Sequence, residues 1–116
     1  MKMMHVTIQT KNFEEEIRFY QEIIGLSIQR ELKGEGRHIV FLGSGDGSPS
    51  IEIIHNPDAN DCGNRHLSIG FKTADAEKTR ETLIEKGYKV SEMISPMPQV
   101  QFFFVRDPAG VTVQLM

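Results

Sequence analysis

The sequence predicts an α+β protein made of two pseudo-symmetric β-α-β-β-β modules, which form a curved, mixed β-sheet cup with the helices on the outside. Three observations predict this fold. Segments 5–11 and 66–72 share one pattern of His, aliphatic, hydroxyl residue, Ile, two variable positions and Lys. A helix-like stretch that ends at a glycine follows each segment, at Gly25 and Gly87. Each half then closes with a short apolar strand that carries one acidic or amide residue.

The repeat also predicts the domain organisation. The chain has 116 residues, and each copy of the pattern covers only about half of them. Units of that size bury a small share of their surface, so the two copies are expected to share one domain over residues 1–116. The modules are expected at about 1–56 and 65–116, joined by a polar stretch that is rich in turn-forming residues.

The elements of the first module follow from periodicity and end signals. Residues 4–10 alternate between apolar and polar side chains, as a half-buried strand does. Asn12 and Glu15 have the spacing of a helix capping box, and Gly25 has the position of a left-handed residue after a helix. The apolar stripe of that helix is expected to consist of Phe13, Ile17, Tyr20 and Ile24. Strands are then expected over 26–32, 38–42 and 50–55, separated by a turn at 34–36 and a loop at 43–49.

The second module repeats this order. We expect a first strand over 66–72, a helix over about 75–86 and a break at Gly87. Three strands complete the module, over 88–94, 100–105 and 111–116, with a proline loop at 96–98 and a turn at 107–110.

Composition excludes several classes of partner. The net charge is −3 and the basic residues are scattered, which argues against nucleic acid. No apolar run approaches the length of a membrane span, and the first residues lack the long apolar region of a signal peptide. The single cysteine, Cys62, excludes an internal disulfide, so we expect a cytoplasmic protein. A small molecule is the expected substrate.

Four polar residues in the repeated strands suggest a metal site. His5 and His66 begin the first strand of each half, while Glu52 and Gln114 interrupt the last one. A buried carboxylate costs several kcal/mol unless it is paired or bound to a metal. Two imidazoles, a carboxylate and an amide oxygen suit one divalent ion such as Zn, Ni, Co, Mn or Fe, with positions left for water and substrate. The alternative is that each histidine is only a hydrogen-bonded residue at a strand start.

The whole chain resembles the vicinal oxygen chelate superfamily, which includes glyoxalase I, ring-cleaving dioxygenases, methylmalonyl-CoA epimerase, and fosfomycin- and bleomycin-resistance proteins. The most specific matches are the helix end Phe-Tyr…Gly-Leu at 19–26 and the Asp-Pro-Ala-Gly turn at 107–110. The resemblance implies a glyoxalase-like domain with metal ligands at His5, Glu52, His66 and Gln114. It also implies a homodimer.

Among these relatives the pattern looks most similar to bacterial glyoxalase I, the lactoylglutathione lyases. The resemblance then implies that Glu52 is the catalytic general base, and that Gln9 and Asn56 bind the substrate. Gln9 stands where relatives have an arginine for the thiol cosubstrate, and Gln114 stands where they have glutamate. A low-molecular-weight thiol other than glutathione is therefore a candidate cosubstrate, and another small oxygenated compound is a candidate substrate.

Three other functions stay open. The same proton chemistry suits an epimerase of acyl thioesters. Two histidines and Glu52 suit an Fe(II) extradiol dioxygenase, although family dioxygenases take their carboxylate from the last strand, which here carries Gln114. The non-enzyme alternative is a small-molecule binding protein of the drug-resistance type, either metal-free or metal-assisted.

Overall fold

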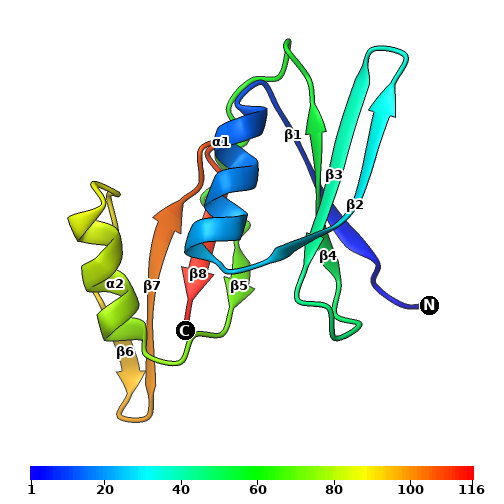
Figure 1. The fold of residues 1–116 in the computed structure, drawn as a ribbon. Helices are drawn as coiled ribbons and strands as arrows, with labels where there is room; N and C mark the ends of the chain where they lie inside the picture. Colours follow the sequence, from blue (N-terminus) through cyan, green and yellow to red (C-terminus); the bar gives the residue numbers. More distant parts are fainter. The chain divides into compact units, whose positions relative to one another are not determined.

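Each half of the chain folds into one helical segment and a four-stranded mixed sheet (Figure 1). A computed structural model describes residues 1–116, which divide into two units, Met1–Cys62 (unit 1) and Gly63–Met116 (unit 2). The two units have the same order of elements along the chain. The predicted α+β class, with two β-α-β-β-β modules, is therefore confirmed. Neither unit contains a helix with the length and apolar character needed to cross a membrane.

Unit 1 places its first strand beside its last one. Its elements are β1 (His5–Thr10), α1 (Phe13–Arg18), the π-helical segment η1 (Phe19–Ile23), β2 (Ser27–Gly34), β3 (Arg37–Gly43) and β4 (Ser50–His55). The strand order is β1-β4-β3-β2. β1 runs parallel to β4, whereas the other neighbours are antiparallel.

The register separates an apolar face of this sheet from a partly polar one. α1 packs against β4, and the ring of Phe13 contacts His38 and His55 on the same side. The apolar residues of this helix face are almost fully buried: Ile8, Val40, Leu42, Ile51 and Ile53. The opposite face carries Thr7, Phe41 and Glu52, and we call it the open face of unit 1. Alternation along β1 and β4 therefore directs Thr7 and Glu52 away from the core.

The helix of unit 1 differs from the prediction in its second half. The α-helix changes to a π-helix at Phe19, where the N–H of Ile24 donates to the carbonyl of Phe19 over 3.2 Å. The wider π turn brings two consecutive residues inside, so both Phe19 and Tyr20 are buried. The predicted apolar stripe contained only Tyr20 of this pair.

The predicted capping box at Asn12 is wrong. Asn12 is the residue before the helix, but its side chain forms no capping hydrogen bond. Its backbone, at φ −93° and ψ 52°, is outside the extended conformation that aims an N-cap side chain at the first turn. The predicted helix ends are correct, because Gly25 and Gly87 both have the left-handed φ, +86° and +89°.

A two-residue turn joins β2 to β3. Glu35 and Gly36 both have positive φ, 53° and 76°, as in the turns whose twist suits a hairpin. The turn predicted at 34–36 is confirmed. Figure 1 shows this hairpin beside β4.

Unit 2 has the same layout with shorter strands. Its elements are β5 (Ile69–Phe71), α2 (Ala76–Glu85), β6 (Ile94–Met97), β7 (Val100–Arg106) and β8 (Thr112–Leu115), with the strand order β5-β8-β7-β6. α2 begins at Asp75, whose side chain accepts a hydrogen bond from the N–H of Lys78, and it packs against β7. The buried residues of this unit include Leu83, Phe103, Val105, Val113 and Leu115.

Two strands of unit 2 differ from the prediction. The strand expected at 66–72 begins only at Ile69, because His66 lies in a turn where its N–H donates to Oδ1 of Asn64 over 2.8 Å. The strand expected over 88–94 is absent except for an isolated bridge at Val90 and for Ile94, which begins β6. Nearby, Oγ of Ser91 accepts from the N–H of Phe104, in place of a backbone carbonyl.

β6 instead occupies the expected proline loop. Pro96 lies within this strand, although proline has no N–H to donate. β6 is at the edge of its sheet, where a missing donor leaves no neighbouring acceptor unsatisfied.

The predicted turn at 107–110 is confirmed and sets the start of β8. Oδ1 of Asp107 accepts hydrogen bonds from the N–H groups of Ala109 and Val111, over 2.9 and 2.8 Å. The N–H of Gly110 donates to the carbonyl of Asp107, which closes the turn. This buried side chain therefore organises the chain immediately before the strand that carries Gln114.

Candidate metal and substrate site

A row of four residues crosses the open face of unit 1, one from each strand. Thr7 is the direct partner of Glu52, Glu52 is the partner of Phe41, and Phe41 is the partner of Arg30. We call these residues the cross-strand row. Direct partners project from the same face of a sheet, so the four side chains are neighbours although they are distant in the sequence.

The carboxylate of Glu52 is the chemical centre of this row. The hydroxyl of Thr7 donates to Oε1 of Glu52 over 2.5 Å, and Nε2 of His5 lies 3.4 Å from the same oxygen. Oε2 of Glu52 takes part in no hydrogen bond with another residue. The Glu52 side chain is 14% exposed and that of His5 is 32% exposed. The carboxylate is thus mostly covered, yet one of its oxygens remains available for a ligand.

Phe41 holds the imidazole of His5 in place. The two rings meet edge to face, with centroids 5.6 Å apart and an angle of 73° between their planes. Such aromatic pairs restrict the rotation of both side chains. The contact with the Phe41 ring therefore helps to keep the His5 imidazole beside Glu52.

The donors of unit 1 fit a divalent metal ion. Nitrogen and carboxylate ligands lie about 2.1 Å from such an ion, so two ligands at a tetrahedral angle are about 3.4 Å apart. The observed separation of Nε2 of His5 from Oε1 of Glu52 is 3.4 Å. An ion between them would exchange the direct contact for two coordination bonds with little movement of either side chain.

The predicted substrate residues Gln9 and Asn56 are joined to each other. Nδ2 of Asn56 donates to Oε1 of Gln9 over 2.9 Å, and Oδ1 of Asn56 accepts from the N–H of Asp58. The backbone N–H of Asn56 also donates to the backbone carbonyl of Thr10. Asn56 is therefore fixed as a support, whereas Gln9 keeps its own NH2 group to donate to a ligand.

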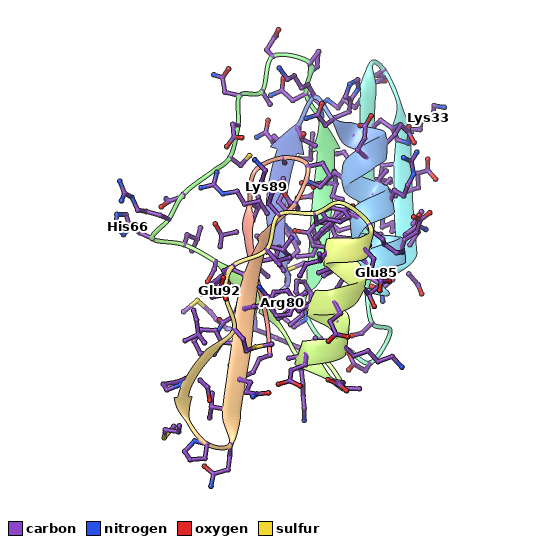
Figure 2. The ribbon with its side chains drawn as sticks, turned by 90° about the vertical axis from the view of Figure 1, so that its left-hand side faces the viewer. Lys33, His66, Arg80, Glu85, Lys89 and Glu92 are labelled. Carbon is purple, nitrogen blue, oxygen red and sulfur yellow. The ribbon has the colours of Figure 1, made fainter.

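The predicted ligands of unit 2 lie in different environments. Gln114 is the partner of Phe104 and of Gly70, and it lines a pocket of about 630 Å³. His66 is exposed and lines another pocket, of about 550 Å³. Figure 2 shows its side chain pointing away from the strands of its unit.

The strand register explains why the two His-to-polar-residue pairs have nearly the same spacing in the sequence but different relative positions in their sheets. In unit 1, Glu52 lies opposite the residue two places after His5. In unit 2, Gln114 lies opposite Gly70, which is four places after His66. Within either unit, no three His, Cys, Asp or Glu side chains gather as a metal-binding group. The four-ligand site is therefore still a prediction.

Sequence reasoning did not single out Thr7, Phe41 or Arg30. Thr7 could have been found, because alternation places it on the same side of its strand as His5. Phe41 and Arg30 have no such signal, since their positions beside Glu52 depend on the pairing of three strands. A second His–Glu pair was also missed: Nε2 of His38 lies 2.6 Å from Oε1 of Glu31.

Comparison with known proteins shows which family the sequence resembles. The family model described as the Glyoxalase/Bleomycin resistance protein/Dioxygenase superfamily matches residues 2–115. The chain is 30% identical over 124 residues to the lactoylglutathione lyase of Neisseria meningitidis serogroup A, covering 100% of this chain and 90% of that one.

Two solved structures illustrate the range of proteins with this fold. The trypanothione-dependent glyoxalase I of Leishmania major has a TM-score of 0.81 at 20% identity, covering 100% of this chain and 86% of that one. TnmS3, an antibiotic binding protein from Streptomyces, has a TM-score of 0.72 at 16% identity, covering 99% and 93%. The same fold therefore occurs in an enzyme and in a binding protein.

Proposed function

The chain belongs to the glyoxalase, bleomycin resistance protein and dioxygenase superfamily, and we propose that it is a divalent-metal-dependent lyase or isomerase of glyoxalase type. Its proposed substrate is a small carbonyl compound or the hemithioacetal of a low-molecular-weight thiol. The observation that carries this proposal is the Glu52 carboxylate, which is held by Thr7, lies 3.4 Å from His5 and has one oxygen available.

His5 and Glu52 would hold the ion from unit 1, and His66 and Gln114 are the proposed ligands from unit 2. When bound, the divalent ion would supply Lewis-acid stabilisation of the negative charge that develops on the substrate oxygens. Gln114 is neutral, so Glu52 is the one carboxylate of the proposed set. The role of base therefore falls to Glu52.

Glu52 would move the proton between neighbouring carbons. With a hemithioacetal, its carboxylate would take the proton from the carbon that bears the hydroxyl and the sulfur and return it to the former carbonyl carbon. The hydroxyl proton would move to the former carbonyl oxygen, so the product is an isomer of the substrate. The hydrogen bond from Thr7 keeps Oε1 in one orientation during this transfer. Gln9, supported by Asn56, would donate to a polar group of the substrate.

The test combines metal content with turnover. The protein is purified, loaded separately with Zn, Ni, Co, Mn and Fe, and assayed with hemithioacetals formed from methylglyoxal and glutathione, cysteine or 2-mercaptoethanol. We expect about one ion per chain, and we expect Glu52→Gln to lower turnover by at least about 100-fold, the usual size of a general-base effect.

A matched control comes from the other His–Glu pair of unit 1. Glu31→Gln removes the carboxylate that contacts His38, at a pair on the opposite side of the sheet. We expect it to leave metal content and turnover within about twofold of wild type, an outcome that separates a local role of Glu52 from a general loss of charge. Absence of metal uptake, or full turnover in Glu52→Gln, would refute the proposed mechanism.

A second candidate is a small-molecule binding protein. The observation in its favour is the position of His66, which lies outside β5 and lines a different pocket from Gln114. A binder would retain a ligand without turnover, whichever metal is supplied. Binding without turnover would support this candidate.

We also propose that the chain acts as a homodimer. β2 is one of the two edge strands of the unit 1 sheet, and its side chains Ile28 and Leu32 are 43% and 40% exposed. Exposed apolar side chains on a sheet edge favour association with another chain. Light scattering after size-exclusion chromatography measures the mass directly, and the mass of a monomer at micromolar concentration would contradict this proposal.

A further inference from the structure

We propose that Arg30 is a specificity-determining residue that binds a carboxylate group of the substrate. The inference rests on the proposed function, because it assigns the reacting end of the substrate to Glu52. It adds the chemical class of the other end and places that end on the β2 side of the sheet, away from Gln9 on β1.

A β-bulge brings Arg30 to the open face. The register between β2 and β3 shifts between Ile28 and Arg30: Ile28 is the partner of Leu42, whereas Arg30 is the partner of Phe41. Strict alternation would place residues 28 and 30 on one face, but these partners lie on opposite faces. Bulges often redirect a side chain in this way beside a binding site.

The bulge also directs a second polar group to the same face. Gly43 follows Phe41 on the open side of β3, and a Cβ atom added to it would lie 2.7 Å from Oε1 of Gln29. The Gln29 amide therefore lies against the Gly43 backbone, where a side chain would displace it. Arg30 and Gln29 are consecutive residues, and together they give a guanidinium and an amide on the open face.

Phe41 positions the guanidinium of Arg30. Cζ of Arg30 lies 5.9 Å from the centroid of the Phe41 ring, within the range of a cation–π contact. Arg30 is exposed, and no carboxylate of the protein forms an ion pair with it. Its charge is thus held in place but not neutralised, as expected of a residue that receives an anion.

The row also sets the distance between the two ends of the substrate. Glu52, Phe41 and Arg30 are direct partners on three neighbouring strands. Strands are about 4.8 Å apart, so the Cα atoms of Glu52 and Arg30 are separated by about 10 Å. A substrate that reacts beside Glu52 would cross the Phe41 ring to place a carboxylate on Arg30.

Unit 2 indicates that this cation is not needed to build the sheet. There Gln114 is the partner of Phe104, just as Glu52 is the partner of Phe41. On the side of Phe104 away from Gln114, the hydrogen-bonded neighbour is Ser91, whose N–H donates to the Phe104 carbonyl. A neutral residue is therefore sufficient at the corresponding position of unit 2.

The guanidinium of Arg30 can bind one planar carboxylate through two parallel hydrogen bonds.

The test uses benzoate and its neutral isostere benzamide as probes. Each is titrated into the full-length protein and followed by NMR chemical shifts, without added metal. We expect wild type to bind benzoate about tenfold more tightly than benzamide, and Arg30→Gln to abolish this difference. Arg30→Lys, which keeps the charge but loses the planar fork, should retain part of it.

Two control variants separate a local site from general charge. Lys33→Gln removes a cation from the same strand, at a position whose partner His38 belongs to the helix face; Lys33 is labelled in Figure 2. Arg37→Gln removes a cation four residues from Phe41 on β3. Both should keep the preference for benzoate. Equal affinity of the wild-type protein for the two probes would overturn the proposal. The proposal would also be overturned if Arg37→Gln lost the preference for benzoate as completely as Arg30→Gln.

The two proposals can fail independently. The probe titration needs neither metal nor turnover, so it measures the Arg30 site alone. A preference for benzoate that depends on Arg30, in a protein that takes up no metal, would leave the carboxylate site standing and remove the metal mechanism. Metal-dependent turnover in a protein whose preference for benzoate does not depend on Arg30 would support the metal mechanism and overturn the carboxylate site.

Discussion

Thr7 and Glu52 are direct partners across β1 and β4, and the hydroxyl of Thr7 donates to Oε1 of Glu52 over 2.5 Å. The contact joins the first and last strands of unit 1 at the residue that we propose as the base. In unit 2 the same relationship pairs Gly70 with Gln114, and Gly70 has no side chain to donate. The two modules share an architecture but differ in how they hold the central polar residue.

Thr7→Val should lower turnover about tenfold while the protein remains folded, because valine has the shape of threonine but cannot donate to Glu52. Thr7→Ser keeps the hydroxyl and should restore most of the activity. The measurement is kcat for each variant after loading with metal. Equal kcat in Thr7→Val and wild type would show that this hydrogen bond does not orient the base.

Asp107→Ala should lower the free energy of unfolding by about 3 kcal/mol, because the N–H groups of Ala109 and Val111 lose their acceptor in a buried turn. Asp107→Asn keeps one acceptor oxygen and should cost less. Urea denaturation of the three proteins measures both effects. A loss below about 1 kcal/mol for the alanine variant would contradict the role given to this side chain.

Glu35→Gly should stabilise the protein by about 0.5–1 kcal/mol, because residue 35 has a φ of 53°, which glycine adopts without strain. Gly36→Ala in the same turn should destabilise it by a similar amount, since φ there is 76°. The midpoints of urea denaturation compare the two variants. The prediction fails if both shift the midpoint in the same direction.

Leu83→Ala should lower the free energy of unfolding by about 3 kcal/mol, because Leu83 is 1% exposed on α2 and its removal leaves a cavity. Its neighbour Ile84 is 48% exposed, so Ile84→Ala should cost less than about 1 kcal/mol. Equal losses at the two positions, measured in urea, would mean that α2 does not pack against its sheet by the face described.

Hydrogen bonds from Ser48 and Ser44 hold the pKa of Asp46 well below its ordinary value of 3.8. Because the folded state favours the carboxylate, the contribution of Asp46 to stability is present above that value and is lost as the pH falls through the lower folded pKa. NMR titration should show the lowered pKa, and Ser48→Ala should raise it. An unchanged pKa in that variant would contradict this assignment of the cause.

The sequence by itself determined the features that depend on local periodicity. The repeated pattern predicts the two modules, and the positions of Gly25 and Gly87 predict where both helices end. Alternation places His5 and Gln9 on one side of a strand and separates Phe103 from its neighbours; Phe103 is indeed fully buried. Such features depend on residues within one turn or one strand, so they can be recognised without the rest of the chain.

The tertiary structure decided which residues become neighbours. Thr7, Phe41 and Arg30 surround Glu52 only because β1, β4, β3 and β2 pair in that order, with a bulge before Arg30. His66 remains outside β5 because Asn64 binds its N–H in a turn, although its spacing from Gln114 nearly repeats that of His5 from Glu52. Strand register is fixed by the hydrogen bonds and the burial of a whole sheet, and a shift of one residue exchanges its faces. For that reason spacing along the chain could suggest the polar residues of the site, whereas their partners depended on the sheet as a whole.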